Sequence, residues 1–438
     1  MLSRRSFLRL SPLGAAVAWS PRLHAEQRGG GAAVQGPLPP SIAALESMKD
    51  RARPFTNQER LARIEKARAL MAAEKIDAIL MNGGSSPQYF ANVSFGGGER
   101  LWALLLPAKG APFIVCPAFE ETRARELLED SPFGANTEIR TWEEDESPFM
   151  EVAAGLRDRG IASGRLGIEE TVKFVFANSV ALAAPALEVV SATPITAGCR
   201  MIKDAHEIEC LRLAGEATLK VYKAVYEALE EGMTQRDVSA LIQAGYSRVG
   251  FPGFASLNVG EYTASPHGSR TPQTIREGTI LMVDDGCKVE GYTSDITRTF
   301  VLGKPTDKMK QVFDVVRRAQ QAALAAARPG APNEAVDAAA RKVLTEAGYG
   351  PGFTYLTHRV GHGMGMDMHE WPYLVKNNMF GWPKGATLKP GMVFSDEPGI
   401  YIKGEFGVRL EDDMHITQTG AELLTPTSPS LEDPFGTA

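Results

Sequence analysis

The chain has 438 residues, of which 44% are hydrophobic and 23% charged, with a formal net charge of −6. This length allows two domains with separate cores. The slight acidic excess argues against a nucleic-acid-binding protein, which normally has a basic face, so we expect no nucleic-acid partner. The four cysteines form no CxxC pair, which argues against a zinc ribbon or a thioredoxin-like motif.

Residues 1–25 have the features of an export signal. Arg4 and Arg5 precede a weakly apolar run over 10–19, and Ala25 offers a small residue for cleavage. This order predicts a signal peptide, and the paired arginines resemble the twin-arginine (Tat) signal. The run is shorter than the roughly 20 residues that span a bilayer. We expect export to the periplasm or the cell exterior without stable membrane insertion; a basic N-terminal tail is the alternative.

Two domains are predicted, and the first is a smaller α/β domain over 56–195. Residues 26–55, rich in glycine, proline and alanine, are expected to form a poorly ordered linker before it. Apolar residues at helical spacing predict a helix from Leu61 to Met71. Alternating segments follow, with strands expected at 76–81, 101–106, 112–116, 137–142 and 165–168, and helices at 119–129 and 148–157.

The second domain is predicted over 200–435. It begins with an amphipathic helix over 205–231, and Thr234, with Asp237 three positions later, begins the next helix. Strands and hairpins dominate the remainder, interrupted by helices expected at 306–328 and 333–347. Strands and helices do not alternate strictly, which favours an α+β domain with a largely antiparallel sheet.

Two hairpins in this domain carry facing carboxylates. The apolar run over 280–283 ends in Asp284, and a hairpin folded near 289–290 is expected to place Asp295 directly opposite. Opposed positions have Cβ atoms about 5 Å apart, and carboxylates that close repel each other unless a proton or a cation neutralises them. A second hairpin, centred on Gly404, is expected to place Glu397 opposite Glu411.

A histidine with glycine on both sides, His362, lies between the two hairpins in the sequence. Four carboxylates and an imidazole form an oxygen-dominated ligand set that suits Mn²⁺ or Co²⁺, with Zn²⁺ and Fe²⁺ as alternatives. Each of these residues alone would be read as a solvated turn carboxylate or a structural histidine. Their coincidence predicts a metal site.

Five segments resemble, in order, the motifs of the pita-bread metallopeptidases, which include Xaa-Pro aminopeptidases, prolidases and methionine aminopeptidases. They are 283–286 (Val-Asp-Asp-Gly), 294–299 (Ser-Asp-Ile-Thr-Arg-Thr), 361–365 (Gly-His-Gly-Met-Gly), 397–401 (Glu-Pro-Gly-Ile-Tyr) and 409–412 (Arg-Leu-Glu-Asp). The resemblance covers 200–425, and the upstream domain resembles, less specifically, the creatinase/prolidase N-terminal domain. It implies an α+β pita-bread catalytic domain preceded by a smaller α/β domain.

The resemblance also implies a dinuclear site and the residues that act there. Two divalent metal ions, with manganese preferred, are expected on Asp284, Asp295, His362, Glu397 and Glu411. His267, His358 and His369 are expected to contact the substrate or the transition state, Glu397 to relay a proton, and Arg409 to orient the carboxylates. The implied reaction is hydrolysis of the bond between an N-terminal residue and proline by a metal-bridged hydroxide.

Three functional readings remain open. An Xaa-Pro aminopeptidase, acting on small peptides with proline at the second position, is preferred; the short 397–411 hairpin has no large insertion, which resembles aminopeptidases and compact prolidases. An Xaa-Pro dipeptidase (prolidase) is the alternative, and it would need a group that captures the prolyl carboxylate. A catalytically silent peptide-binding relative is disfavoured by the complete ligand set. We expect a homodimer.

Overall fold

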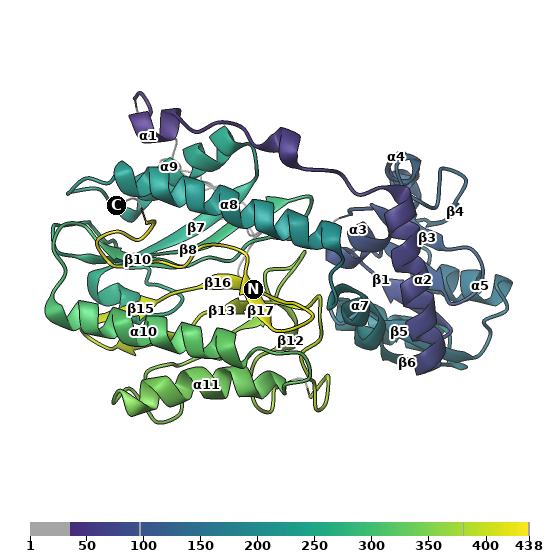
Figure 1. Ribbon diagram of the computed structural model, residues 1–438. Helices are drawn as coiled ribbons and strands as arrows, with labels where there is room; N and C mark the ends of the chain where they lie inside the picture. Colours follow the sequence, from purple (N-terminus) through teal and green to yellow (C-terminus); the bar gives the residue numbers. More distant parts are fainter. Residues whose placement is uncertain (1–35, 96–97, 380, 437–438) are drawn as a thin grey trace, which may run out of the picture.

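The computed structural model describes residues 36–95, 98–379 and 381–436. The predicted signal peptide, residues 1–25, lies outside these ranges. The described chain forms two domains joined at α7, which spans Thr193–Arg200. The smaller domain lies at the right of Figure 1, with the long helix α2 in front of its strands. In the part of the chain that the structure describes, no helix has the length and apolar character that a bilayer crossing requires.

The first domain has one six-stranded mixed sheet in the order β4-β3-β2-β1-β5-β6. Its central strands are fully buried because helices cover both faces. Helix α2 begins with a complete capping box between Thr56 and Glu59. The strands are β1 Ala78–Met81, β2 Ala103–Pro107, β3 Phe113–Pro117, β4 Glu138–Trp142, β5 Gly164–Ile168 and β6 Leu187–Ser191. The helices are α2 Asn57–Glu74, α3 Ser85–Ala91, α4 Glu121–Glu129, α5 Pro148–Asp158, α6 Phe174–Ala183 and α7.

The second domain has two pairs of helices with antiparallel strands between them (Figure 1). Capping boxes begin the first pair at Asp204 and Thr234, the latter with Asp237 as predicted. Helix α8 ends four residues earlier than the predicted Glu231. The helices are α8 Ala205–Glu227, α9 Gln235–Val249, α10 Asp307–Ala326 and α11 Asn333–Glu346. This architecture confirms the predicted α+β fold with an antiparallel sheet.

The strands form sheets in the orders β10-β8-β7 and β12-β11-β13-β16-β17, together with the β14-β15 hairpin. Alternate residues of β8 enter different cores: Leu281 packs in the core with α8 and α9, whereas Ile280 packs in the core with α10 and α11. The strands are β7 Gly253–Val259, β8 Ile280–Val289, β9 Tyr292–Thr293, β10 Arg298–Val301, β11 His362–Gly363, β12 Glu370–Tyr373, β13 Val393–Asp396, β14 Gly399–Ile402, β15 Phe406–Arg409, β16 Asp412–Ile416 and β17 Ala421–Leu423.

The described part of the expected linker, residues 36–55, packs against the second domain. Its helix α1, Pro40–Ala43, buries Ile42 completely, and Ser41 donates to the carbonyl of Ala224 on α8 at 2.7 Å. Met48 donates its backbone N–H to Val249 at the end of α9. The chain therefore contacts the second domain first, crosses to the smaller domain at α2, and returns through α7.

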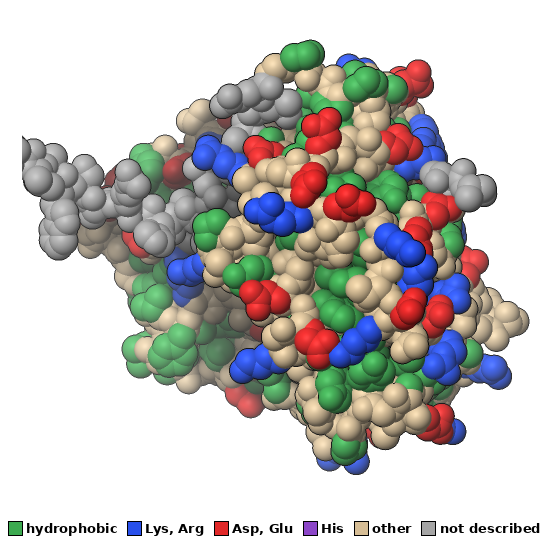
Figure 2. All heavy atoms as spheres, turned by 90° about the vertical axis from the view of Figure 1, so that its left-hand side faces the viewer, with side chains coloured by type: hydrophobic (Ala, Val, Ile, Leu, Met, Phe, Trp, Pro, Cys, Tyr) green, Lys and Arg blue, Asp and Glu red, His purple; other side chains and the backbone are tan. Residues whose placement is uncertain are grey.

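On the face seen in Figure 2, basic side chains are interspersed with acidic ones, and apolar side chains lie between them. The basic side chains of this face form no continuous patch.

Glu169, just after β5, is a buried carboxylate at the junction between the domains. It is 5% exposed, and Ser86 on α3 donates a hydrogen bond to it. Burial raises its pKa to about 7, although Ser86 and Arg200 act in the opposite direction. The folded protein therefore holds this proton more tightly than the unfolded chain does, in which a glutamate has a pKa of about 4.3.

This shift predicts a pH-dependent loss of stability. The proton contributes its full stabilisation below about pH 4.3, and this contribution is lost as the pH rises through the pKa of Glu169 in the folded protein, about 7. The total loss in the free energy of unfolding is on the order of 3 kcal/mol. Glu169→Gln does not titrate. We expect its melting temperature to exceed that of the wild type by a margin that grows from pH 5 to pH 8. Glu170→Gln, at the exposed next position, is the control; an equal, pH-independent margin for both variants would contradict the prediction.

Candidate metal centre

The first predicted hairpin exists, but its register differs from the prediction. Residues 290 and 291 form the turn, with φ of 49° and 90°, so the turn lies one residue later than expected. β8 pairs Lys288 with Thr293 and Val283 with Arg298. The same register brings Thr297 opposite Asp284, and Asp295 is a diagonal neighbour on the same face. The expectation of directly opposed aspartates is therefore wrong, although carboxylate oxygens of the two still lie within 4.8 Å.

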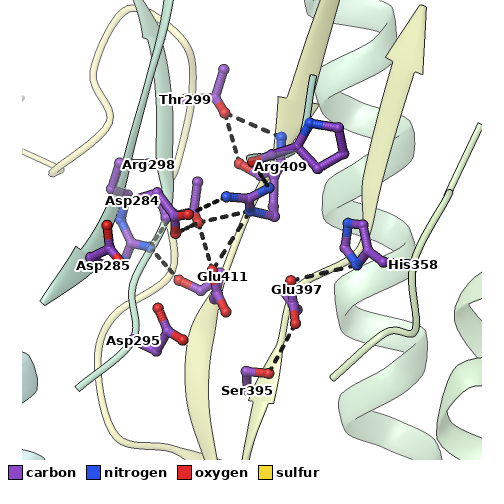
Figure 3. Close-up of polar contacts among 12 residues, drawn as sticks. Asp284, Asp285, Asp295, Arg298, Thr299, His358, Ser395, Glu397, Arg409 and Glu411 are labelled. Carbon is purple, nitrogen blue, oxygen red and sulfur yellow. Dashed lines mark hydrogen bonds and ion pairs between the residues drawn. The ribbon is translucent and has the colours of Figure 1, made fainter. Parts of the chain in front are cut away.

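The second hairpin has the predicted register. β14 pairs Gly399 with Arg409, and the turn contains Gly404 with φ of 79°. Continuing this pairing by two residues brings Glu397 opposite Glu411. The two carboxylates approach each other at the mouth of the hairpin, beside the strands that carry Asp284 and Asp295 (Figure 3).

His362 reaches the carboxylates because glycines on both sides let its strand approach its neighbours. A Cβ on Gly361 would lie 2.1 Å from the Ser395 carbonyl oxygen, and one on Gly363 would lie 2.5 Å from that of Trp371. Nδ1 of His362 lies 3.1 Å from the Gly363 carbonyl, which requires Nδ1 to donate. Nε2 is then an acceptor. It faces Glu397 at 3.4 Å and Asp295 at 3.6 Å.

The candidate ligand atoms form three overlapping sets, each with its atoms within 4.8 Å of one another. These sets are Asp284, Asp295 and Glu411; His362, Glu397 and Glu411; and Asp295, His362 and His369. The five residues predicted as ligands thus lie together, and His369 lies beside them. His362 is 1% exposed and Glu411 2%.

The electrostatics of the cluster fit bound cations. Burial, and then the neighbouring carboxylates, raise the pKa of Asp295 and of Glu411 well above the ordinary range. Burial, and then the positive charge of neighbouring groups, lower the pKa of His362 well below its ordinary value, so the imidazole stays neutral. Ionised carboxylates this close need a neutralising cation. Oxygen ligands with one neutral imidazole suit Mn²⁺ or a similar divalent ion.

Arg409 contacts two of the candidate ligands, Asp284 and Glu411. It forms an ion pair with Asp284, and its Nε lies 3.7 Å from Glu411 (Figure 3). Burial raises the pKa of Asp284, but Arg409 and Thr297 outweigh this effect, so the pKa is lowered. Arg409 therefore keeps one carboxylate ionised and oriented.

The three other predicted histidines differ in their surroundings. His358 contacts the Tyr401 hydroxyl at 2.7 Å through Nε2, and its Nδ1 lies 3.6 Å from Glu397. His369 stacks on His362 with ring centroids 3.8 Å apart. His267 is exposed, and the carbonyl of Pro266, just before it, accepts a hydrogen bond from Arg409 at 3.3 Å. All three histidines therefore lie close to the carboxylate cluster.

Several residues of the site were not identified from the sequence. The Thr297 hydroxyl lies within hydrogen-bond distance of carboxylate oxygens of both Asp284 and Glu411, and Tyr401 joins His358 to Arg409 through its hydroxyl. Thr297 lies two positions after Asp295 and therefore on the same strand face, so this spacing could have identified it as a residue of the site. Tyr401 belongs to a quoted motif, but nothing in its spacing indicates its partners.

Arg359 was also not identified, and its setting is unusual. Its guanidinium lies 4.1 Å from the centre of the Tyr373 ring. Burial raises the pKa of Glu397 to about 7 and lowers the pKa of His362 and His369; the charge of Arg359 opposes the first effect and adds to the second. Among the residues that the structure describes, the Arg359 side chain has no hydrogen bond and no ion pair. Burial lowers its own pKa. A partly buried cation beside the carboxylate cluster thus lacks an anionic partner within the described part of the protein.

Two family models match the chain: "Metallopeptidase family M24" over residues 209–418 and "Creatinase/Prolidase N-terminal domain" over 63–202. A probable dipeptidase PepE of Mycobacterium tuberculosis is 37% identical over 363 residues, covering 81% of this chain and 92% of the relative. An Xaa-Pro dipeptidase of Lactobacillus delbrueckii subsp. lactis is 32% identical, covering 84% and 98%.

Among solved structures, dipeptidase PepE from Mycobacterium ulcerans matches with a TM-score of 0.78 and 32% identity, over 87% of this chain and 99% of that one. The Mycobacterium tuberculosis and Lactobacillus relatives are aligned over 92% and 98% of their own lengths, and both carboxylate-bearing hairpins fall within the residues that the M24 model matches. The chain therefore belongs to metallopeptidase family M24, with a pita-bread catalytic domain preceded by a creatinase/prolidase N-terminal domain.

Proposed function

We propose that this protein is an Xaa-Pro dipeptidase that holds two divalent ions, with manganese preferred, on Asp284, Asp295, His362, Glu397 and Glu411. Three overlapping ligand sets that share residues support two ions rather than one. When bound, such ions polarise the scissile carbonyl and lower the pKa of water. The remaining chemistry is assigned to groups of the chain itself.

Glu397 is the proton carrier in this proposal. Its carboxylate lies at the edge of the cluster, near Nδ1 of His358 at 3.6 Å and Nε2 of His362 at 3.4 Å. The nitrogen of an Xaa-Pro bond has no hydrogen, so it must receive a proton to leave as an amine. A carboxyl group within reach of both the attacking water and the leaving nitrogen meets this need.

His267 and His369 are proposed to donate hydrogen bonds to the substrate carbonyl as its oxygen becomes negative. His369 stacks on His362, and the loss of water around its ring, together with the charge of Arg359, lowers its pKa to about 4. A neutral imidazole at neutral pH donates through one ring nitrogen only. Stabilisation of developing charge by a preoriented donor contributes roughly 3 kcal/mol in comparable sites.

The observation that carries the dipeptidase assignment is the unpaired Arg359. Charged side chains with little exposure are normally paired, because removing a charge from water without a partner is costly. A dipeptide has a free carboxylate next to the proline ring, and arginine binds carboxylates through two parallel hydrogen bonds. A longer peptide has no carboxylate at that position. The relatives named as dipeptidases support the same choice over the aminopeptidase that was preferred from the sequence.

The test compares three substrates that share the Ala-Pro unit. Purified protein, depleted of metal and resupplied with Mn²⁺, is incubated with Ala-Pro, with Ala-Pro-amide and with Ala-Pro-Ala, and products are separated by chromatography. We expect kcat/KM for Ala-Pro to exceed that for the other two by at least about 10-fold, as one charge-assisted hydrogen bond would give. Preferential cleavage of Ala-Pro-Ala would establish the aminopeptidase instead. No cleavage of any of them would favour the silent binding protein.

A further inference from the structure

The loop that carries His369 is buried in its first half and more exposed toward His369. It spans 364–369, between β11 and β12. Its first half is held by backbone hydrogen bonds, from Met364 to the Val393 carbonyl and from Thr293 to the Gly365 carbonyl. In the described chain the His369 side chain makes no hydrogen bond, only the stack on His362. The position of this ring therefore depends on what holds the second half of the loop.

The second half is held by Arg200, the last residue of α7 at the domain junction. The guanidinium of Arg200 forms ion pairs with Asp367 and with Glu370, so it contacts the chain on both sides of His369. Burial lowers the pKa of Arg200, but the two carboxylates outweigh this effect and raise it. The side chains of Arg200 and Glu370 are 10% and 7% exposed, so this ion pair is shielded from water, whereas Asp367 is 47% exposed.

Both carboxylates are also tied to other elements. Ser85 on α3 donates to Asp367 at 2.6 Å, and Lys203, with a 1% exposed side chain, lies 2.7 Å from Glu370. A Cβ on Gly365 would lie 2.4 Å from Glu370 Oε1, so glycine there lets the carboxylate approach the loop. The smaller domain and the domain junction thus contact the loop through side chains that flank His369.

We propose that Arg200 is a positioning residue for His369, through which the smaller domain fixes the active-site loop. The inference rests on the proposed function, since hydrolysis of an Xaa-Pro bond is the readout. Arg200 does not touch the substrate or the ligand cluster. It holds Asp367 and Glu370 at a fixed spacing, and the backbone between them then directs the imidazole of His369 toward the substrate carbonyl. A displacement near 1 Å of such a group costs up to about 100-fold in rate.

A double-mutant cycle tests whether Arg200 acts through His369. Arg200→Gln, His369→Ala and the double variant are compared with the wild type on the Xaa-Pro substrate that the wild type cleaves best. We expect Arg200→Gln to lower kcat between about 10-fold and 100-fold with KM changed less than about 3-fold. In the His369→Ala background the same substitution is expected to cost less than about 3-fold, because the group that it positions is gone.

Arg63→Gln is the matched control. Arg63 is likewise a buried arginine at the domain junction, 3.5 Å from Glu207 and hydrogen-bonded to the Tyr89 carbonyl, but it does not contact the 364–369 loop. Any loss from loosening the junction should be equal in the wild-type and His369→Ala backgrounds. Metal content and melting temperature are measured for every variant, so that loss of metal or of folding is not mistaken for misplacement of the ring.

Equal losses from Arg200→Gln in both backgrounds would overturn the inference, and would leave the proposed function intact if the wild type cleaves the substrate. Should Arg200→Gln fold poorly, Asp367→Asn repeats the cycle, because it removes one ion pair and keeps the pair between Arg200 and Glu370. Arg200→Lys is expected to recover only part of kcat, since one ammonium group lacks the planar fork that contacts two carboxylates. Full recovery by lysine would contradict the two-sided contact.

Discussion

Replacing Glu411 with glutamine is expected to lower kcat by at least about 1000-fold and to abolish binding of two metal ions. Glu411 belongs to two of the three ligand sets, one with Asp284 and Asp295 and the other with His362 and Glu397. A residue shared in this way would help to hold both ions. Polarisation by a metal ion is worth several kcal/mol, and about 4 kcal/mol corresponds to 1000-fold in rate.

The same substitution is expected to stabilise the fold of the metal-free protein. Burial, and then Asp295 and Glu397, raise the pKa of Glu411 well above its ordinary value. Without a cation, this group opposes folding whenever it is ionised, and glutamine removes that cost. We therefore expect the variant to melt above the wild type in chelator and below it in Mn²⁺.

Metal content by mass spectrometry, kcat and melting temperature are measured in parallel. Glu405→Gln is the matched control, because Glu405 lies on the same hairpin at an exposed turn position and pairs with Lys308. It should retain two ions per chain and near-normal kcat. Two ions retained by Glu411→Gln would show that Glu411 is no ligand, and an unchanged melting difference between chelator and Mn²⁺ would argue against coupling of metal and folding.

Sequence spacing predicted the carboxylate hairpins because successive side chains of a strand point to opposite faces, with a period of two residues. The Glu397–Glu411 pairing followed from a glycine turn whose centre is fixed at Gly404. The Asp284–Asp295 pairing was wrong by two positions, because the turn uses residues 290 and 291. When a turn shifts by one residue, the partner of each strand residue changes by two positions. Because side chains alternate with a period of two, Asp284 and Asp295 still point to the same face and come close together.

Contacts between segments far apart in the chain could not be predicted in the same way. Arg200 and Glu370 are separated by 170 residues, and neither alternation nor helical period relates them. Residues 36–55 have the composition of a linker, yet Ile42 is completely buried against the catalytic domain. Composition indicates whether a segment would be ordered in isolation. The tertiary surface that it meets decides whether it becomes ordered.

The unpaired Arg359 predicts a change of substrate preference. A charge-assisted hydrogen bond contributes about 1.5 to 3 kcal/mol, which corresponds to roughly 10-fold to 150-fold in kcat/KM. Arg359→Gln is therefore expected to lower kcat/KM for Ala-Pro by that factor, chiefly through KM. Ala-Pro-amide has no carboxylate for Arg359 to bind, so its kcat/KM should change less than about 3-fold.

This difference between the two substrates separates carboxylate binding from an indirect effect on the cluster. Burial raises the pKa of Glu397 and lowers that of His369, and the charge of Arg359 favours the lower pKa in both, so its loss would also act on the chemistry itself. An effect of that kind would reduce cleavage of the amide and of the dipeptide equally. Equal reduction would therefore refute the assigned subsite.

Arg359→Lys sharpens the comparison, because it keeps the positive charge and removes the planar fork. Lysine preserves most of the electrostatic influence on Glu397 but binds a carboxylate as a point charge, without two parallel hydrogen bonds. We expect it to leave amide cleavage at the wild-type level and to restore only part of the dipeptide activity. Tyr373, whose ring lies against the guanidinium, holds the arginine in place beside the cluster. In the proposed dipeptidase, that fixed position limits the site to a substrate that ends at proline.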